Sequence, residues 1–168
     1  MVTTARRNVI LYAGWIMFCK RFIAATILFG AISWCSFGQN VSAGLQKELI
    51  RADRGIWEAM SGSHPDMERV DKALAVDYLD VDSGVRHARD ETLEYVRGLT
   101  KFSFQYRNAR AYLLSPTSGY VIAELSYSSV QNGNAAAGQV LTTTVFSKEN
   151  GHWVAHLHTE MDLKPEKR

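Results

Sequence analysis

The chain has 168 residues, of which 46% are hydrophobic, and these values are typical of one compact domain with a packed core. The formal net charge is +2, but four of the 19 basic residues lie in the first 21 positions, before any acid appears. The rest of the chain is therefore mildly acidic, which argues against a nucleic-acid partner, because such binding depends on a basic surface.

Both cysteines, Cys19 and Cys35, lie near the N-terminus. The chain after Ser36 consequently offers no disulfide, no thiolate metal ligand and no cysteine nucleophile. A domain without thiols suits an oxidising compartment, although many cytosolic domains also lack cysteine.

Residues 1–43 are predicted to be an export signal. Lys20-Arg21 precedes an apolar run, and Val41-Ser42-Ala43 resembles the small-residue pattern that signal peptidase accepts. Cleavage would give a periplasmic or secreted protein with no further membrane association. The alternative is an uncleaved leader that anchors the chain in a membrane, although the run is slightly short of the roughly 20 apolar residues that span a bilayer.

A second apolar run precedes Lys20-Arg21, which is unusual for a signal peptide. Translation that begins at Met17 would remove this run, and a twin-arginine signal at Arg6-Arg7 is another explanation. A lipid on Cys35 is disfavoured, because lipoprotein processing requires a small residue where Trp34 stands.

Three helices are expected after the leader. Apolar residues recur every three or four positions from Gly44 to Gly62, as on one face of an amphipathic helix that Gly62 would end. A short helix follows, with Ser63 as its predicted N-cap and Pro65 in its first turn. Residues 90–99 form the third helix, with acidic side chains early, where the helix dipole favours them.

The rest of the chain is predicted to be strands. Residues 75–82 form a short strand, and the period changes to two in residues 102–114, 120–131, 139–148 and 153–161, which are rich in β-branched and aromatic side chains. Proline, glycine and asparagine stand between these long strands, as tight turns require. This order predicts an α+β fold in which a curved antiparallel sheet wraps over the helices, followed by a frayed tail, residues 164–168.

Four segments stand out together: IWEAM at 56–60, AVDYLDVDSG at 75–84, DETL at 90–93 and NGHWVAHLH at 150–158. They resemble the landmarks of the SnoaL-like proteins, and more narrowly the domain of unknown function 4440, within the nuclear transport factor 2-like superfamily. The last segment is also similar to the end of the calcium/calmodulin-dependent kinase association domain.

The resemblance implies a cone-shaped domain over residues 44–163, with three N-terminal helices packed on a strongly curved antiparallel sheet. It also implies a pocket on the concave face of the sheet and homodimers formed through the sheet. It does not fix a reaction, because the superfamily contains isomerases, cyclases, dehydratases and non-catalytic modules.

Two histidines on the last strand, His156 and His158, are candidate catalytic residues. Residues two apart in a strand face the same side, so both imidazoles are expected to project together from backbone positions about 6.5–7 Å apart. Glu160 is about 13 Å from His156 along a regular strand, which is too far for shared ligation, so no metal site is predicted. The preferred interpretation is a hydrogen-bonded, neutral pair at a pocket rim or dimer interface, and the alternative is a general acid or base.

Asp80 and Asp82 are the second pair of candidate catalytic residues, on the same strand face as Tyr78. A carboxylate inside an apolar cone would have a raised pKa and could remove a proton beside a carbonyl. The preferred interpretation is that both acids are solvated at a strand end, before the turn at Ser83-Gly84.

The large aromatic residues are the candidate ligand-binding residues, since a small apolar ligand requires an aromatic wall, although residues with such spacing also form cores. They are Trp57, Tyr78, Tyr112, Tyr127 and Trp153.

The sequence therefore predicts an exported protein that binds a small, largely apolar ligand, self-associates through its sheet, or does both, without catalysis and without a cofactor. The alternative is an isomerase, dehydratase or hydrolase that uses an aspartate and a histidine of the pocket.

Overall fold

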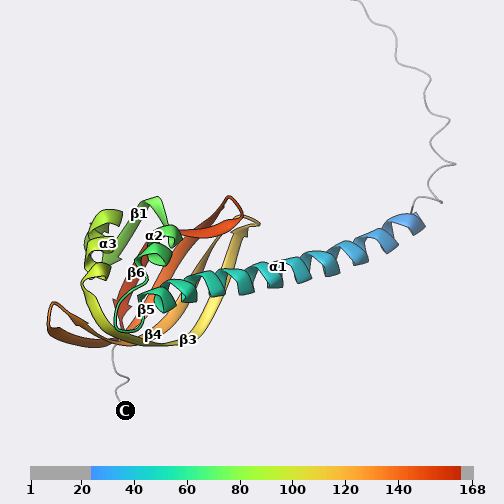
Figure 1. Cartoon of the computed structure of the whole chain (residues 1–168). Coiled ribbons are helices and arrows are strands. Elements are labelled where there is room, and N and C mark those ends of the chain that lie inside the picture. The colour runs from blue at the N-terminus through green and yellow to red at the C-terminus, as the bar shows by residue number, and fades with distance from the viewer. Residues whose placement is uncertain (1–23, 164–168) are drawn as a thin grey trace, which may run out of the picture. The chain divides into compact units, whose positions relative to one another are not determined.

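Three helices and six strands make up residues 24–163, the part of the chain that the computed structural model describes, with side chains described from Ser42 onward. The helices are α1 (Ala24–Met60), α2 (Met67–Ala73) and α3 (Arg89–Arg97) (Figure 1). The strands are β1 (Leu74–Asp82), β2 (Val85–Ala88), β3 (Leu99–Ser115), β4 (Ser118–Gln131), β5 (Asn134–Glu149) and β6 (His152–Asp162).

The chain separates into two units between Asn40 and Val41. The described part of the first unit is the stretch of α1 from Ala24 to Asn40, and the second unit contains the rest of α1 and every other element. The predicted start at Met17 and the predicted frayed tail lie outside the described residues. Of the described helices, none is both long enough and apolar enough to cross a membrane.

The segment between α1 and α2 reverses the chain. Gly62 has a φ of +102°, a conformation that glycine adopts without strain, and this ends α1 as predicted. The backbone N–H of Asp66 then donates to the Ala59 carbonyl at 2.7 Å. The Asp66 carboxylate caps α2 by accepting from the Arg69 N–H at 3.2 Å. The prediction of Ser63 as the N-cap is wrong, because the chain reversal uses residues 63–65.

The sheet has the strand order β2-β1-β6-β5-β4-β3. All neighbouring pairs are antiparallel except β1 and β6, which run parallel. A parallel pair needs a long crossover, and here β2, α3 and the strands β3 to β5 supply it. The predicted α+β fold, with three helices on a strongly curved sheet, is confirmed, but β2 and the parallel pair were not predicted.

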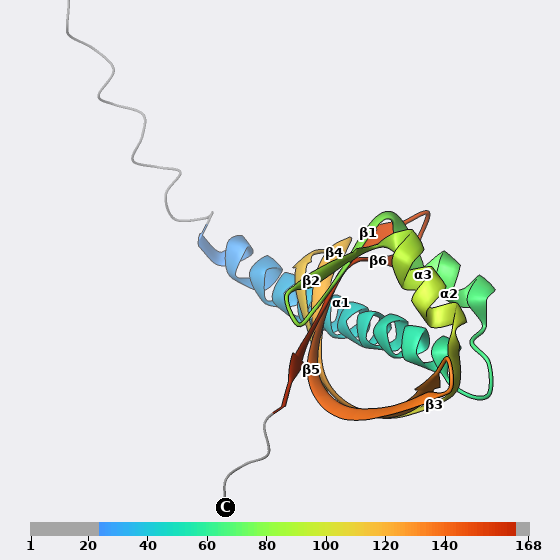
Figure 2. The ribbon, with the colours of Figure 1, turned by 90° about the vertical axis from the view of Figure 1, so that its left-hand side faces the viewer.

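The sheet curls round the C-terminal part of α1, as Figure 2 shows for β3 to β5. Register shifts between β3 and β4 bring extra residues into the long strands, and Lys101 and Asn108 adopt positive φ at two of them. Such bulges bend a strand and increase its twist. The concave face of the sheet therefore holds a core that includes Leu49, Val121 and Phe146.

Three of the hairpins close with two consecutive residues of positive φ, at Ser83-Gly84, Asn132-Gly133 and Asn150-Gly151. Two such residues are the signature of type I′ turns, whose twist matches that of the paired strands. The predicted turns at these positions are therefore confirmed.

Candidate functional site

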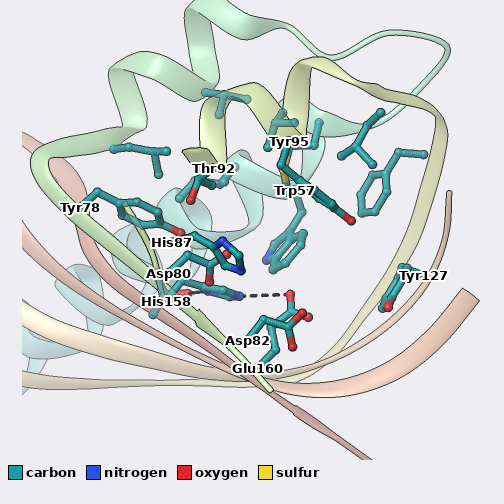
Figure 3. A pocket seen from close by; sticks show the side chains of 18 of the residues that line it. Trp57, Tyr78, Asp80, Asp82, His87, Thr92, Tyr95, Tyr127, His158 and Glu160 are labelled. Atoms are coloured by element: carbon teal, nitrogen blue, oxygen red, sulfur yellow. Dashed lines mark hydrogen bonds and ion pairs between the residues drawn. The ribbon is translucent and has the colours of Figure 1, made fainter. Parts of the chain in front are cut away.

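A cavity of about 180 Å³ lies between the concave face of the sheet and the helices (Figure 3). Helix α1 contributes Trp57 and Met60, α3 contributes Tyr95 and Val96, and the start of β3 contributes Phe102. Most of this lining is hydrocarbon or aromatic ring, which is typical of a site for a small organic molecule.

The polar wall of the cavity is a row of side chains that crosses four strands. The strand registers place Asp80 of β1 beside His87 of β2 and beside His158 of β6, and His158 beside Thr144 of β5. Neighbouring strands are only about 4.8 Å apart, so side chains of such a row meet on one face of the sheet. All four residues line the cavity.

A second row lies one step further along the same strands, where Asp82 of β1 is paired with Glu160 of β6. Both residues line the cavity. Asp82 is exposed, whereas Glu160 is partly buried and faces His158. Acidic side chains therefore gather at one end of the polar wall.

His158 is held in place by three neighbours. Its side chain is buried, with Nδ1 2.9 Å from Thr144 Oγ1 and Nε2 3.3 Å from Glu160 Oε1, and Trp57 packs edge-on at 5.4 Å between ring centroids. Since a carboxylate oxygen accepts, Nε2 carries a proton. Burial alone would lower the pKa of His158, but the hydrogen bond and charge of Glu160, with the charges of Asp80 and Asp53, outweigh it and raise the pKa.

Asp80 presents a buried oxygen to this wall. Its Oδ1 atom is buried and has no hydrogen-bond partner among the described residues. Burial raises the pKa of the Asp80 carboxyl and the charge of Glu160 raises it further, while His158 and His87 oppose the shift. The preferred interpretation of two solvated aspartates is therefore wrong for Asp80, which is partly buried with one carboxyl oxygen enclosed, and holds only for the exposed Asp82.

Asp53 is a buried carboxyl that the sequence analysis did not single out. It lies on α1, is 1% exposed and accepts a hydrogen bond of 2.6 Å from the Tyr106 hydroxyl. Burial raises the pKa of the Asp53 carboxyl, and the hydroxyls of Tyr106 and Thr144 reduce that rise. Its position follows Leu49 by four residues and precedes Trp57 by four, so the helical period already placed an acid on the buried face.

The prediction that His156 and His158 share a face is wrong. The pairing of β6 with β5 and with β1 shifts register at this point, so that Ala155 and Leu157 are paired and His156 between them is not. This bulge interrupts the alternation of side chains, and only His158 lines the cavity.

His156 has its own partners outside the cavity. Its Nδ1 lies 2.8 Å from Asp77 Oδ1, and its Nε2 lies 2.8 Å from Ser147 Oγ and 3.3 Å from Glu149 Oε1. Among residues 42–163, whose side chains the structure describes, no three histidine, cysteine or acidic side chains converge as ligands for a metal ion.

Of the five predicted ligand-binding aromatic residues, some line the cavity and others lie outside it. Trp57, Tyr78 and Tyr127 line the cavity. Tyr112 and Trp153 do not, contrary to the prediction: Tyr112 stacks on Tyr120 with ring centroids 4.9 Å apart, and Lys148 Nζ lies 5.0 Å from the ring centroid of Trp153.

Several lining residues were not recognised in the sequence. Thr144 belongs to a segment that was predicted only as a strand, and Glu160 was considered only as a metal ligand. Thr92 lies in the landmark DETL without an assigned role, and His87 lies in a segment with no motif. The strand registers and the packing of α3 bring them to the cavity, and neither is visible in a local pattern.

Comparison with solved structures identifies the fold. An NTF2-like protein of unknown function in nutrient uptake from Rhodospirillum rubrum matches with a TM-score of 0.63 and 19% identity over 69% of this chain and 98% of that chain. The association domain of C. elegans CaMKII matches with a TM-score of 0.57 and 17% identity over 68% and 92%. A ketosteroid isomerase-like protein from Erwinia carotovora atroseptica matches with a TM-score of 0.57 and 12% identity over 71% and 97%.

The sequence itself matches no family model and no curated protein. Identities below 20% show a shared fold and no more, because one fold serves many unrelated activities. The nuclear transport factor 2-like fold that the resemblance implied is confirmed, whereas the narrower assignment to the domain of unknown function 4440 stays a prediction.

Proposed function

We propose, starting from the nuclear transport factor 2-like fold and the cavity that it encloses, that this domain binds a small, largely apolar molecule beneath its sheet. The observation that carries the proposal is that two residues of the cavity lining, Asp80 and Thr92, each keep a buried side-chain oxygen, Oδ1 and Oγ1, without a hydrogen-bond partner among the described residues. A buried polar atom without a partner destabilises a fold by about 1–3 kcal/mol. A ligand that supplies hydrogen bonds to these atoms, and packs its apolar part on the aromatic wall, would offset that loss.

A thermal-shift screen of small molecules on the purified protein tests this proposal, since a ligand that binds the native state raises the melting temperature. Replacing Val96, which lines the cavity, by phenylalanine should fill part of the space and abolish the shifts, while the melting temperature without ligand shows that the variant is folded. Leu93→Met is a matched control on the same helix, because Leu93 is buried but does not line the cavity. Equal ligand shifts in wild type and Val96→Phe would contradict binding at this cavity.

A second candidate function is an isomerase or dehydratase, and the arrangement of Asp80 beside His158 favours it. A partly buried carboxylate with a raised pKa, such as that of Asp80, is suited to remove a proton from carbon next to a carbonyl. Asp80 could return that proton at another carbon atom, which completes an isomerisation, and His158, oriented by Thr144 and Glu160, could deliver its own ring proton to a departing hydroxyl group, which leaves as water. One of the proteins that share the fold is described as ketosteroid isomerase-like.

Deuterium incorporation from heavy water tests the second candidate. A panel of cyclic ketones and β-hydroxy ketones is incubated with the protein, and exchange beside the carbonyl and loss of water are followed by NMR. Catalysed exchange that Asp80→Asn removes and Asp162→Asn preserves would establish the proposed base. Exchange at the uncatalysed rate throughout the panel, with ligands that do bind, would leave the protein a binding module.

We also propose export and self-association, each with its own test. N-terminal sequencing of protein from the exported fraction should begin at Asn40 or Gly44, and an intact Met1 there would contradict cleavage. A homodimer is compatible with the association domain among the proteins that share the fold. Sedimentation equilibrium should give twice the mass of the processed chain, and a monomer at micromolar concentration would contradict dimerisation.

A further inference from the structure

We infer that the ligand of the cavity is a small aromatic or alicyclic amine, bound as its protonated ammonium form. The inference rests on the proposed binding function and adds the chemical class of the ligand. It follows from the charge of the cavity lining, from the chemistry of its unpartnered atoms and from its size.

The charged lining is acidic. The carboxyl groups are those of Asp53, Asp80, Asp82 and Glu160, and the imidazoles are those of His87 and His158; none of the described lysines and arginines lines the cavity. Glu160 contacts His158, and Tyr106 donates to Asp53, so these groups already have partners inside the protein. Asp80 and the exposed Asp82 remain to face a ligand, and their negative charge favours a cation and repels an anion.

The unpartnered atoms point to the same class. Thr92 is 9% exposed, its Oγ1 has no hydrogen-bond partner among the described residues, and it lines the cavity together with Asp80 (Figure 3). Both unpartnered cavity atoms are oxygens that can accept a hydrogen bond. An ammonium group has only donors and can donate to both oxygens, whereas the ionised Asp80 carboxylate can only accept and so cannot donate to a carboxylate or phosphate ligand.

The remaining walls suit the hydrocarbon part of such an amine. Trp57 stacks near Phe102 at 6.3 Å between ring centroids, and Phe102 stacks near Tyr127 at 6.4 Å, so aromatic faces form a continuous surface in the cavity. The face of an aromatic ring attracts cations as well as hydrocarbon. A cavity of about 150 Å³ is large enough for benzene. The cavity here, about 180 Å³, therefore fits one six-membered ring with a short chain.

Three compounds of closely similar size test whether the charge of the ligand, and not its shape, decides its affinity: 2-phenylethylamine, 2-phenylethanol and 3-phenylpropanoate. They carry a positive charge, no charge and a negative charge. Titration calorimetry with the full protein should show the amine binding about tenfold or more tightly than the alcohol, as expected for a hydrogen bond to a charged group, and the carboxylate binding most weakly. Asp80→Asn should remove the advantage of the amine over the alcohol. Asp162→Asn is the control, because Asp162 is an exposed acid on β6 that does not line the cavity.

The outcomes distinguish this inference from the proposal on which it rests. Equal affinity for the amine and the alcohol, or an amine advantage that survives Asp80→Asn, would overturn the amine and leave a binding cavity. Tighter binding of the carboxylate would also overturn it. Absence of binding by all three compounds overturns the inference too, and the broader thermal-shift screen then decides separately whether the cavity binds any ligand.

Discussion

Thr92 and Asp53 represent two ways in which a polar residue is buried near this cavity. The Asp53 carboxylate receives a hydrogen bond from Tyr106, whereas the Thr92 hydroxyl has no partner among the described residues. Natural proteins keep few unpartnered buried groups, and those that persist often belong to functional sites. Removal of the Thr92 hydroxyl should therefore raise the stability of the fold and weaken ligand binding.

Replacing Thr92 by valine, which has nearly the same shape, removes the unpartnered hydroxyl. We expect the free energy of unfolding to rise by about 1 kcal/mol, because the desolvation penalty of the hydroxyl disappears. The affinity for any ligand that bonds to this hydroxyl should fall. Urea unfolding measures the first effect and calorimetry the second. A loss of stability would show that the hydroxyl is paired in solution.

The buried acids make stability depend on pH. Burial raises the pKa of Asp53 and Asp80 above the ordinary value of 3.8, so the folded protein holds these protons to higher pH than the unfolded chain does. The raised pKa of His158 acts in the same direction above 6.5. Where the native state binds more protons, the free energy of unfolding falls as pH rises.

We therefore expect the contribution of Asp53 to the free energy of unfolding to be lost as pH rises above 3.8. The wild-type profile should then fall relative to that of Asp53→Asn, whose amide cannot ionise but whose oxygen can still accept from Tyr106. Urea unfolding at a series of pH values measures both profiles. Glu58→Gln, on the exposed side of the same helix, should keep the wild-type slope. Parallel profiles for wild type and Asp53→Asn would show that Asp53 does not contribute.

At the scale of elements, strand periodicity and turn composition were sufficient to predict the long strands and their hairpins. They were not sufficient for the β6 bulge, because a bulge arises from how neighbouring strands pair and leaves no pattern within its own strand. The bulge separates two histidines that a regular strand would place together. The parallel pairing of β1 with β6 was not predicted either, because pairing between strands far apart in the sequence leaves no local pattern. The adjacent positions of Asp80 and His158, which depend on this pairing, were therefore also missed.

The bulge predicts different effects for the two histidines. His158→Gln should weaken ligand binding several-fold, since the ring lies in the cavity wall between Thr144 and Glu160. His156→Gln should leave the affinity unchanged, because this side chain contacts Asp77 and Ser147 outside the cavity. Calorimetry with the same ligand compares the two variants, and equal losses of affinity would mean that the strand is regular in solution.

The contact between α1 and β4 depends on Gly119. A Cβ atom there would lie 2.7 Å from the Tyr112 carbonyl oxygen and 2.8 Å from Leu49 Cδ2, so Gly119→Ala should lower the free energy of unfolding by about 1–3 kcal/mol through overpacking. Gly55→Ala is the control, because a Cβ atom there meets no atom within 4 Å and alanine favours the helix by about 0.5–1 kcal/mol. Urea unfolding should give opposite signs, and a stabilising Gly119→Ala would contradict the close approach.

At the scale of the whole molecule, the second unit has a core of its own. The buried hydrophobic cluster extends from Leu49 to Ala155, and it combines the last turns of α1, the helices α2 and α3 and all the strands that face them. The predicted boundary at Gly44 lies close to the start of this unit at Val41. The general α+β order was accessible from the sequence because all three helices precede the four long strands, and the switch from helical to strand spacing is a property of local patterns.

A fragment that begins at Gly44 should therefore fold without the preceding residues. We expect a single cooperative unfolding transition, because every buried hydrophobic residue of the cluster is retained. Near-ultraviolet circular dichroism should show ordered aromatic side chains, with Trp57 packed against His158 and Phe102. A second fragment that begins at Arg54 is the control, since it lacks Leu49 and Asp53, which are buried against the sheet, and should unfold at much lower urea concentration. Equal stability of the two fragments would show that this part of α1 is not required for the core.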